Sequence, residues 1–331
     1  MGIQDPFPCP QTNYTEETNM KGLIIDDVHP KIAEELGKHM EIATKMLPSQ
    51  EELAAMIGDV DVLIMRVDPA IDKTIIDAAK NLKVIGVCSV GLNHVDMDAA
   101  KAAGIEVFNA PGMNANAVAE LTICKLLEMS RHTIPAHNDV TKKHEWDKYK
   151  WVGRELRGKT LGIMGFGRIG RRVGEIARVF GMDIVAYDPY LKPEDFEKEH
   201  AKGMGTDELL KVSDYVTIHV PLTDETKDLI SKKSIAEMKN DCVVLNMSRG
   251  GIVNEKDMYE ALKGGQIGGY ATDVLENELA GGGLHGHDTF ASPLFECDNF
   301  IVTPHLGAQT IDASKDIGDY IVGKIRETLK L

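Results

Sequence analysis

The stretch TLGIMGFGRIGRR, residues 160–172, decides the fold of this chain. An apolar run over 160–164 meets three glycines at G-x-G-x-x-G spacing, Gly165, Gly167 and Gly170, and an amphipathic segment follows at once. The pattern predicts a buried strand that ends in a tight turn and opens a helix. Gly165 would permit the turn, Gly167 would let a pyrophosphate approach the backbone, and Gly170 would let helix and strand pack closely. The free N–H groups of the first helical turn would then face the phosphates of a dinucleotide.

A carboxylate farther along the chain supports this interpretation. A second apolar run, 183–187, ends in Asp188, where an acid would accept hydrogen bonds from an adenosine ribose. Asp188 would also repel a 2′-phosphate, and Pro189 and Tyr190 follow it rather than an arginine. The sequence therefore predicts NAD rather than NADP as the cofactor.

The composition argues against several classes of protein. A length of 331 residues suggests two domains, and 43% hydrophobic with 27% charged residues is typical of a soluble globular protein. The net charge of −15 argues against nucleic-acid binding. No apolar run approaches the roughly 18 residues of a membrane span, and no signal peptide opens the chain. We therefore expect a cytoplasmic protein without a membrane partner.

The five cysteines are scattered, which is typical of reduced thiols in the cytosol. Cys88, Cys124 and Cys242 lie among apolar residues and are predicted to fill the core.

The chain begins with a polar extension, residues 1–20, and then alternates between β-rich runs and helical stretches. The runs are GLIIDD, VDVLIM, LKVIGVCSV and GIEVF, and the helical stretches are Lys31–His39, Gln50–Met56, Asp72–Lys80 and Val95–Ala102. This alternation predicts a first α/β domain with a parallel sheet.

A long helix is expected over about 115–133, where a broad apolar face predicts that it is well buried. A polar segment, 137–158, follows and carries Trp146, Tyr149 and Trp151. These aromatic residues cover their own domain or contact a second subunit, and the sequence leaves both alternatives open.

The rest of the chain predicts a doubly wound sheet of six strands. Strands are expected at about 160–165, 183–187, 215–219, 242–246, 268–272 and 300–303, with helices at about 168–180, 206–212, 231–239, 255–263 and 308–329. The last helix is long for its neighbours, so we expect it to pack back on the first domain.

Charged side chains follow the last three strands: Arg249, then Glu276 and Glu278, then His305. Ligands of open α/β sheets bind beyond the carboxyl ends of the strands. A guanidinium can hold a carboxylate and polarise a carbonyl, and an imidazole transfers protons near neutral pH. A nearby carboxylate would orient the imidazole and keep its acid form available. These residues therefore predict an acid–base site.

With these motifs, the chain resembles the D-isomer-specific 2-hydroxyacid dehydrogenase family over about residues 21–331. The resemblance rests on GVCSVGLNHVD, FNAPGMNANAVAE, LRGKTLGIMGFGRIG, VAYDP, HVPLTDET, NMSRGGIVNE, GGYATDVLENE and IVTPHLGAQT. It implies an α/β fold of two Rossmann-like domains with doubly wound parallel sheets. A nucleotide domain at 116–307 would be inserted into a flavodoxin-like substrate domain at 21–115 and 308–331.

The resemblance also implies the site residues. The catalytic residues would be Arg249, His305 and Glu278, the second acid of ENE, rather than Glu276. The cofactor positions fall on Gly165, Gly167, Arg168, Ile169, Gly170, Asp188, His219, Pro221, Thr226, Met247, Asp273 and Gly307. Asp273 would face the nicotinamide carboxamide. The substrate positions fall on Arg66, Val90, Gly91 and Arg249, although Arg66 as a plain surface arginine is the alternative.

The expected activity is the NAD-dependent interconversion of a D-2-hydroxy acid and its 2-keto acid, on a phosphoglycerate or hydroxypyruvate/glyoxylate type of substrate, in a homodimer. The alternative is an NAD(H)-sensing, corepressor-like binding protein on the same scaffold. Since the chain stops at Leu331, no C-terminal regulatory domain is expected. A Gly- and His-containing loop at 280–292 would shape specificity at the mouth of the site. Its His285 and His287 are too few to predict a metal.

Overall fold

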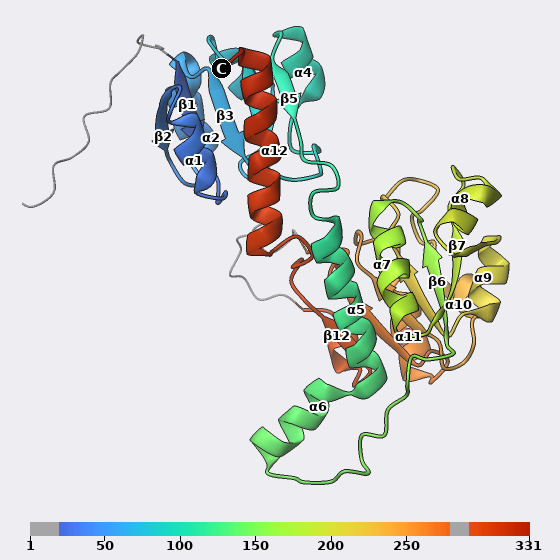
Figure 1. Cartoon of the computed structure of the whole chain (residues 1–331). Coiled ribbons are helices and arrows are strands. Elements are labelled where there is room, and N and C mark those ends of the chain that lie inside the picture. The colour runs from blue at the N-terminus through green and yellow to red at the C-terminus, as the bar shows by residue number, and fades with distance from the viewer. Residues whose placement is uncertain (1–19, 279–290) are drawn as a thin grey trace, which may run out of the picture. The chain divides into compact units, whose positions relative to one another are not determined.

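The computed structural model describes residues 20–278 and 291–331. The predicted N-terminal extension and nearly all of the loop at 280–292 therefore lie outside the described residues. The chain forms two compact units: unit 1 comprises residues up to Pro111 and Ser314–Leu331, and unit 2 comprises Gly112–Ala313 (Figure 1). These boundaries lie a few residues from those expected after residues 115 and 307. Which unit binds the substrate stays a prediction.

Unit 1 is built on a parallel sheet with the strand order β2-β1-β3-β4-β5. Its strands are β1 (Lys21–Ile24), β2 (Glu41–Thr44), β3 (Val62–Met65), β4 (Val84–Val87) and β5 (Glu106–Phe108). Its helices are α1 (Lys31–Leu36), α2 (Gln50–Met56), α3 (Lys73–Ala78), α4 (Met97–Ala102) and most of α12 (Ile311–Leu329). This strand order is that of flavodoxin-like folds, as predicted.

The central strands β3 and β4 are buried along their whole length, which explains why their sequences, VLIM and VIGV, are continuously apolar. The edge strand β2 was not predicted. None of its four side chains is buried, so it lacks the apolar signal that identifies an inner strand.

The last helix, α12, covers the sheet of unit 1, as expected. A Cβ placed on Gly86 of β4 would lie 2.7 Å from Cγ2 of Ile321, and Ile325 lies beside it. Both isoleucines are fully buried. The absence of a side chain at Gly86 thus lets the helix approach the strand closely.

Unit 2 is built on a second parallel sheet, with the order β12-β11-β10-β9-β6-β7-β8. Its strands are β6 (Thr160–Met164), β7 (Asp183–Tyr187), β8 (Lys202–Gly203), β9 (Tyr215–Ile218), β10 (Val243–Asn246), β11 (Gly269–Thr272) and β12 (Phe300–Val302). Its helices are α5 (Ala115–Arg131), α6 (Thr133–Asn138), α7 (Arg168–Val179), α8 (Pro193–Lys198), α9 (Thr206–Val212), α10 (Lys232–Ile235) and α11 (Glu255–Lys263). The strand order reverses at β6, as in doubly wound dinucleotide-binding folds. The predicted fold class is confirmed, although α8 and β8 were not predicted.

Helix α5 is buried as predicted, and it packs against α7, β10 and β11. The prediction for Cys124 was wrong, because this thiol is exposed, whereas Cys88 and Cys242 are buried. Ile123 and Leu126 face the core, and position 124 lies on the outer side of the helix. The apolar neighbours of Cys124 in the sequence therefore did not indicate its own environment.

After α5 the chain forms an arm, residues 132–153, which contains α6, and then enters β6 (Figure 1). The base of the arm is closed by the N–H of Arg154, which donates to the carbonyl oxygen of Ser130 at 2.8 Å. Met129, the residue before Ser130, packs on Gly269 at the start of β11. The arm therefore leaves from the amino ends of the strands, opposite the edge where the predicted site residues lie.

Candidate active site

The turn between β6 and α7 has the geometry that its glycines predict. Gly165 has a φ of 89°, and a Cβ there would lie 2.7 Å from the carbonyl oxygen of His219. A Cβ on Gly170 would lie 2.2 Å from the carbonyl oxygen of Gly165, so helix and turn are in contact. A Cβ on Gly167, by contrast, would meet nothing within 4 Å. The open side of the turn is therefore at Gly167.

Gly167 is also the N-cap of α7 and provides no side-chain acceptor to the first helical turn. The N–H groups of that turn have no carbonyl partner within the helix. Together with the helix dipole they favour an anion in the open space beside Gly167. These features fit the pyrophosphate of a dinucleotide.

Asp188 follows β7 and is half-buried beside the glycine turn. Its Oδ2 accepts the N–H of Phe166 at 3.0 Å, and its Oδ1 accepts the N–H of Tyr190 at 3.0 Å. Each carboxylate oxygen can accept a second hydrogen bond, so both remain suited to a ribose hydroxyl. The acid thus fixes the turn as well as being placed for the predicted contact.

The other predicted cofactor residues also lie at or beyond the carboxyl ends of strands of unit 2. They are Arg168 and Ile169 after β6, His219, Pro221 and Thr226 after β9, Met247 after β10, Asp273 after β11 and Gly307 after β12. The sheet therefore brings all of the predicted cofactor positions to one edge.

The ring of His219 is held inside the fold. Its Nε2 lies 2.9 Å from Oγ1 of Thr217, and its buried Nδ1 has no partner among the described residues. Burial lowers the pKa of His219 to about 3, so the ring is neutral at physiological pH. A neutral, buried ring leaves the backbone of His219, which contacts Gly165, as the part that shapes the cofactor edge.

The charged residues Arg249, Glu278 and His305 follow three strands that are direct neighbours in the sheet, β10, β11 and β12. In the sheet, Asn246 of β10 pairs with Thr272 of β11, and Thr272 pairs with Val302 of β12. The hydrogen bonds between the backbones continue beyond the strands. The N–H of Asp273 donates to the carbonyl oxygen of Asn246 at 3.0 Å, and the N–H of His305 donates to the carbonyl oxygen of Asp273 at 2.9 Å. Backbone hydrogen bonds therefore hold the segments that follow β10, β11 and β12 next to one another.

Arg249 lies in the loop after β10. The buried amide of Asn246 donates to the carbonyl oxygen of Arg249 at 2.9 Å and accepts from the N–H and hydroxyl of Ser248. The exposed guanidinium donates through Nη1 to the carbonyl oxygen of Ser248 at 2.7 Å. A guanidinium has five N–H donors, so its fork can still bind a ligand carboxylate.

His305 and Glu278 form a pair, with Nδ1 and Oε1 separated by 3.0 Å. Both side chains keep part of their surface exposed, 34% and 25%. Glu276 does not contact His305; it is exposed, and its N–H donates to Glu255. The geometry thus pairs the histidine with the second acid of ENE.

The loop that carries His305 is held by Asp273, which is 3% exposed. The Asp273 carboxylate accepts the N–H of Leu306 at 2.8 Å, the N–H of Gly307 at 2.7 Å and the hydroxyl of Thr303. His305 itself has a φ of 54°, a backbone conformation that costs a non-glycine residue free energy and often marks functional sites. Asp273 therefore has a clear task in positioning the histidine, in addition to its predicted contact with the cofactor.

Of the predicted substrate residues, Arg249 lies in unit 2, and Arg66, Val90 and Gly91 lie in unit 1, at the carboxyl ends of its strands. Arg66 follows β3, and its N–H donates to the buried carboxylate of Asp26 at 3.0 Å. Val90 and Gly91 follow β4, and the amide of Asn109 donates to the carbonyl oxygen of Val90 at 2.6 Å. Asp26 was not predicted as a residue of this edge of the sheet, although an acid that closely follows a buried strand, here β1, indicates a place at the carboxyl end of the sheet.

The described residues contain no group of three or more potential metal ligands. His285 and His287 lie outside them. Within the described chain, no helix has the length and apolar character needed to cross a membrane.

Taken together, the glycine turn, the acid after β7 and the charged residues that follow β10, β11 and β12 define a dinucleotide-binding α/β protein with a histidine–carboxylate pair at the ligand edge of its sheet. Residues 123–307, more than half of the chain, match the family model for the NAD-binding domain of D-isomer specific 2-hydroxyacid dehydrogenases. The chain therefore belongs to the D-isomer specific 2-hydroxyacid dehydrogenase family. The matched domain binds NAD, as the sequence predicts.

Two relatives show how the similarity is distributed. The chain is 41% identical over 320 residues to a D-3-phosphoglycerate dehydrogenase of Methanocaldococcus jannaschii, covering 94% of this chain but 58% of that protein. It is 38% identical over 292 residues to a hydroxypyruvate reductase of Thermotoga maritima, covering 88% of this chain and 92% of that protein. The chain thus spans little more than half of the first relative and nearly all of the second.

Among solved structures, the fold is similar to that of a D-lactate dehydrogenase of Aquifex aeolicus in complex with NAD and lactic acid. The TM-score is 0.78 at 27% identity, and the alignment covers 93% of this chain and 95% of that one.

Proposed function

We propose that this protein is an NAD-dependent oxidoreductase that interconverts a D-2-hydroxy acid and the corresponding 2-keto acid. The observation that carries the proposal is the His305–Glu278 pair, which lies on the same sheet edge as the glycine turn and Arg249. An acid–base pair beside a dinucleotide turn is what a carbinol–carbonyl interconversion requires.

Each residue of the site has a defined task in this reaction. Arg249 holds the substrate and polarises its C2 carbonyl. The bound cofactor supplies the hydride for reduction at C2 and accepts it in the reverse direction. Glu278 engages Nδ1 of His305, which leaves Nε2 to donate a proton to the carbonyl oxygen, or to remove it from the hydroxyl. Glu278 keeps the ring oriented.

The substrate class is inferred from the relatives. One is named as a D-3-phosphoglycerate dehydrogenase and another as a hydroxypyruvate reductase. We infer a phosphoglycerate or hydroxypyruvate/glyoxylate type of substrate for this chain. The backbone near Val90 and Gly91 would bind its carboxylate, and Arg66 its distal group.

The catalytic assignment is tested by His305→Gln. We expect turnover to fall by about 10²–10⁴-fold, because the proton donor is lost, while NADH binding persists. The assay follows NADH absorbance with glyoxylate, hydroxypyruvate, pyruvate, branched 2-keto acids and phosphohydroxypyruvate. His200→Gln is the matched control, since His200 is exposed and has a similar φ, 55° against 54°. Unchanged turnover in His305→Gln would refute the assignment. NADH binding without turnover of any substrate would favour the NAD(H)-sensing alternative.

The cofactor preference rests on Asp188. Its carboxylate lies where a 2′-phosphate would be repelled, so we infer a preference for NADH over NADPH. Steady-state kinetics with both cofactors should give a higher kcat/KM for NADH than for NADPH. Asp188→Ser should lower the ratio of the two kcat/KM values. A wild-type enzyme that prefers NADPH would contradict the inference.

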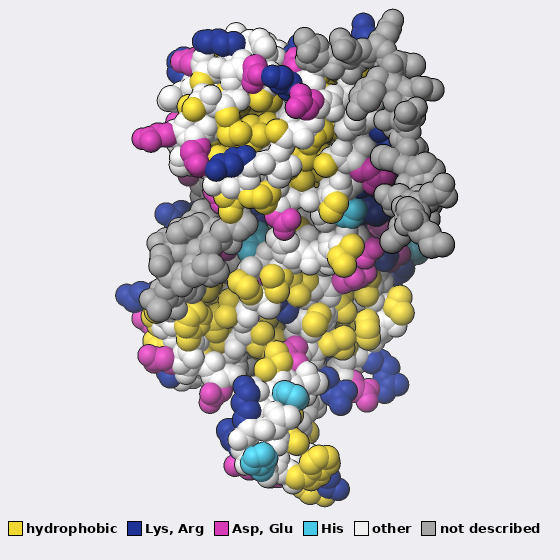
Figure 2. Space-filling model, turned by 90° about the vertical axis from the view of Figure 1, so that its left-hand side faces the viewer, with side chains coloured by type: hydrophobic (Ala, Val, Ile, Leu, Met, Phe, Trp, Pro, Cys, Tyr) yellow, Lys and Arg dark blue, Asp and Glu magenta, His cyan; other side chains and the backbone are white. Residues whose placement is uncertain are grey.

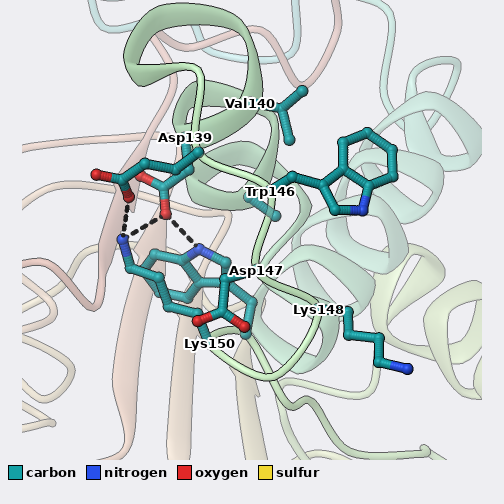
Figure 3. A pocket seen from close by; sticks show the side chains of 9 residues that line it. Asp139, Val140, Trp146, Asp147, Lys148 and Lys150 are labelled. Atoms are coloured by element: carbon teal, nitrogen blue, oxygen red, sulfur yellow. Dashed lines mark hydrogen bonds and ion pairs between the residues drawn. The ribbon is translucent and has the colours of Figure 1, made fainter.

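The arm supports a homodimer. Trp146, Tyr149 and Val152 are 86%, 75% and 75% exposed and lie close together in the sequence of the arm, and apolar side chains that gather on a surface mark interaction sites. Hydrophobic side chains also gather at the tip of the arm in Figure 2. A hollow on the arm is lined by Trp146, Val140 and the ion pair of Asp139 with Lys150 (Figure 3). We infer that a second copy of the chain covers this surface.

We infer a cytoplasmic location for the protein. It rests on the scattered free thiols, and fractionation of cells that express the tagged protein would test it.

A further inference from the structure

Two segments of the site approach each other at a glycine. The Arg249 loop, residues 247–254, follows β10, and the Glu278 turn, residues 275–278, follows β11. A Cβ placed on Gly250 would lie 2.3 Å from the carbonyl oxygen of Leu275 and 2.7 Å from the N atom of Glu276. The peptide group between Leu275 and Glu276 therefore lies directly against Gly250. No side chain fits there unless the two segments move apart.

Glu255 joins the same two segments by a hydrogen bond. It is the first residue of α11, directly after the Arg249 loop, and its Oε1 accepts the N–H of Glu276 at 2.6 Å. Asn254 caps the helix, since its side chain accepts the N–H of Asp257 at 3.0 Å. The cap fixes the backbone from which the carboxylate of Glu255 reaches the turn.

From Glu276 the contacts lead to the histidine. The N–H of Leu275, on the other side of the clamped peptide, donates to Oε2 of Glu278 at 3.3 Å, and Oε1 of Glu278 lies 3.0 Å from Nδ1 of His305. The N–H of Glu278 also donates to the carbonyl oxygen of Leu275 at 3.3 Å, which closes the turn. The position of the Leu275–Glu276 peptide thus sets the direction of the Glu278 carboxylate.

The surroundings of Glu255 are unfavourable for a charge. Burial raises the pKa of Glu255, as do the charges of Glu276 and Glu278, while the hydrogen bond from Glu276 opposes this change. The Glu255 carboxylate thus lies where burial and neighbouring charges disfavour it, yet it accepts the N–H of Glu276. This placement indicates that Glu255 positions the Glu276 peptide.

We propose that Glu255 and Gly250 are positioning residues, which clamp the Glu278 turn to the Arg249 loop and so fix the His305–Glu278 pair relative to Arg249. Neither residue touches the reacting atoms. They act through the peptide of Leu275 and Glu276. The inference rests on the proposed function, because the clamp serves a site that transfers a proton.

The proposal is tested with Glu255→Ala and Glu255→Gln in the full chain. Glu255→Ala removes the acceptor, so we expect kcat to fall by about ten- to a hundred-fold, because small displacements of reacting groups are costly. The KM for NADH should stay within about twofold, because Glu255 hydrogen-bonds Glu276, which is not one of the predicted cofactor positions. Glu255→Gln keeps an amide oxygen as acceptor and should retain kcat within about threefold. Glu260→Ala, an exposed residue on the same helix, is the matched control.

A second readout separates positioning from a general loss of stability. In Glu255→Ala the pH profile of kcat should shift, because the histidine is no longer held by a fixed carboxylate, whereas Glu255→Gln should keep the wild-type profile. Gly250→Ala should reproduce the effect of Glu255→Ala through the steric route. A Glu255→Ala protein with lowered stability but wild-type kcat and pH profile would overturn the proposal.

The proton on Nδ1 of His305 gives a readout that does not depend on activity. Its NMR resonance reports the hydrogen bond to Glu278 and should move or broaden in Glu255→Ala but not in Glu260→Ala. If the wild-type protein turns over no substrate, the proposed function fails, yet this spectrum still tests the clamp. An unchanged Nδ1 resonance in Glu255→Ala would overturn the clamp on its own.

Discussion

At the scale of single residues, the least expected feature is a lysine in the buried face of α5. Lys125 is 3% exposed, and its Nζ has no hydrogen-bond partner among the described residues. Burial lowers the pKa of Lys125, and the charge of Asp273 opposes this change.

We predict that Lys125→Met stabilises the protein by about 1–3 kcal/mol near neutral pH, because a buried charge without a hydrogen-bond partner is replaced by an apolar side chain of similar length. The folded-state pKa of Lys125 is lower than the unfolded one, so the unfolded chain binds more protons between the two values. The wild-type penalty is therefore largest below the folded-state pKa and shrinks as pH rises through it.

The measurement is the free energy of unfolding in urea at about pH 7 and about pH 10. Lys233→Met, on an exposed position of α10, serves as the control and should change stability little. A Lys125→Met variant less stable than wild type would show that the amine has a partner that compensates its burial.

At the scale of elements, the two tryptophans of the arm have different environments. Trp151 serves the arm itself: its Nε1 donates to Oδ2 of Asp139 at 2.7 Å, and its ring lies 6.0 Å from that of His132. Lys143 and Lys150 also bind Asp139 and, with the indole, hold the pKa of that carboxyl well below its usual range. Trp146 takes no part in this network and stays exposed.

We predict that Trp146→Ser weakens the homodimer by about 30-fold or more, since exposed tryptophans at interfaces often contribute 2 kcal/mol or more to binding. Analytical ultracentrifugation over a range of protein concentrations measures the change. Tyr190→Ser is the control, because Tyr190 is 92% exposed but lies after β7, outside the arm. A wild-type chain that sediments as a monomer at micromolar concentration would contradict the inferred dimer.

At the scale of the whole molecule, the chain leaves unit 1 at Pro111 and returns to it at Ser314, so unit 1 is completed only by α12. Ile321 and Ile325 of this helix are fully buried against the sheet of unit 1. An ion pair between Lys31 and Asp319 joins α1 to α12 at 2.5 Å. The folding of unit 1 therefore depends on residues that follow all of unit 2 in the sequence.

We predict that Ile321→Ala lowers the free energy of unfolding of unit 1 by about 2–5 kcal/mol, because it leaves a cavity between α12 and β4. Urea denaturation followed by circular dichroism measures the loss, and NADH fluorescence reports unit 2 separately. Thr328→Ala, exposed on the same helix, should change stability by less than about 0.5 kcal/mol. Equal stability of the two variants would mean that α12 is not part of the core of unit 1.

The sequence alone determined the glycine turn at residues 160–172 and the buried strands. The glycine turn and the buried strands are local features, in which backbone freedom and hydrophobic period dictate the conformation. The position of His305 could also be located from the sequence, because a side chain that follows a buried parallel strand lies at the ligand edge of the sheet. The observed strands of unit 2 accordingly lie close to the predicted ones.

Only the tertiary structure decided which side chains meet. It placed the Glu255 carboxylate on the N–H of Glu276, a contact that no motif indicates, whereas the contact of His305 with Glu278 is one that the family resemblance already implies. It also exposed Cys124 while burying Lys125 beside it. Periodicity reports the average polarity of a face, but a contact depends on strand order and on how closely two backbones approach, as at Gly250. Those quantities are set by packing between elements far apart in the sequence, and no local pattern encodes them.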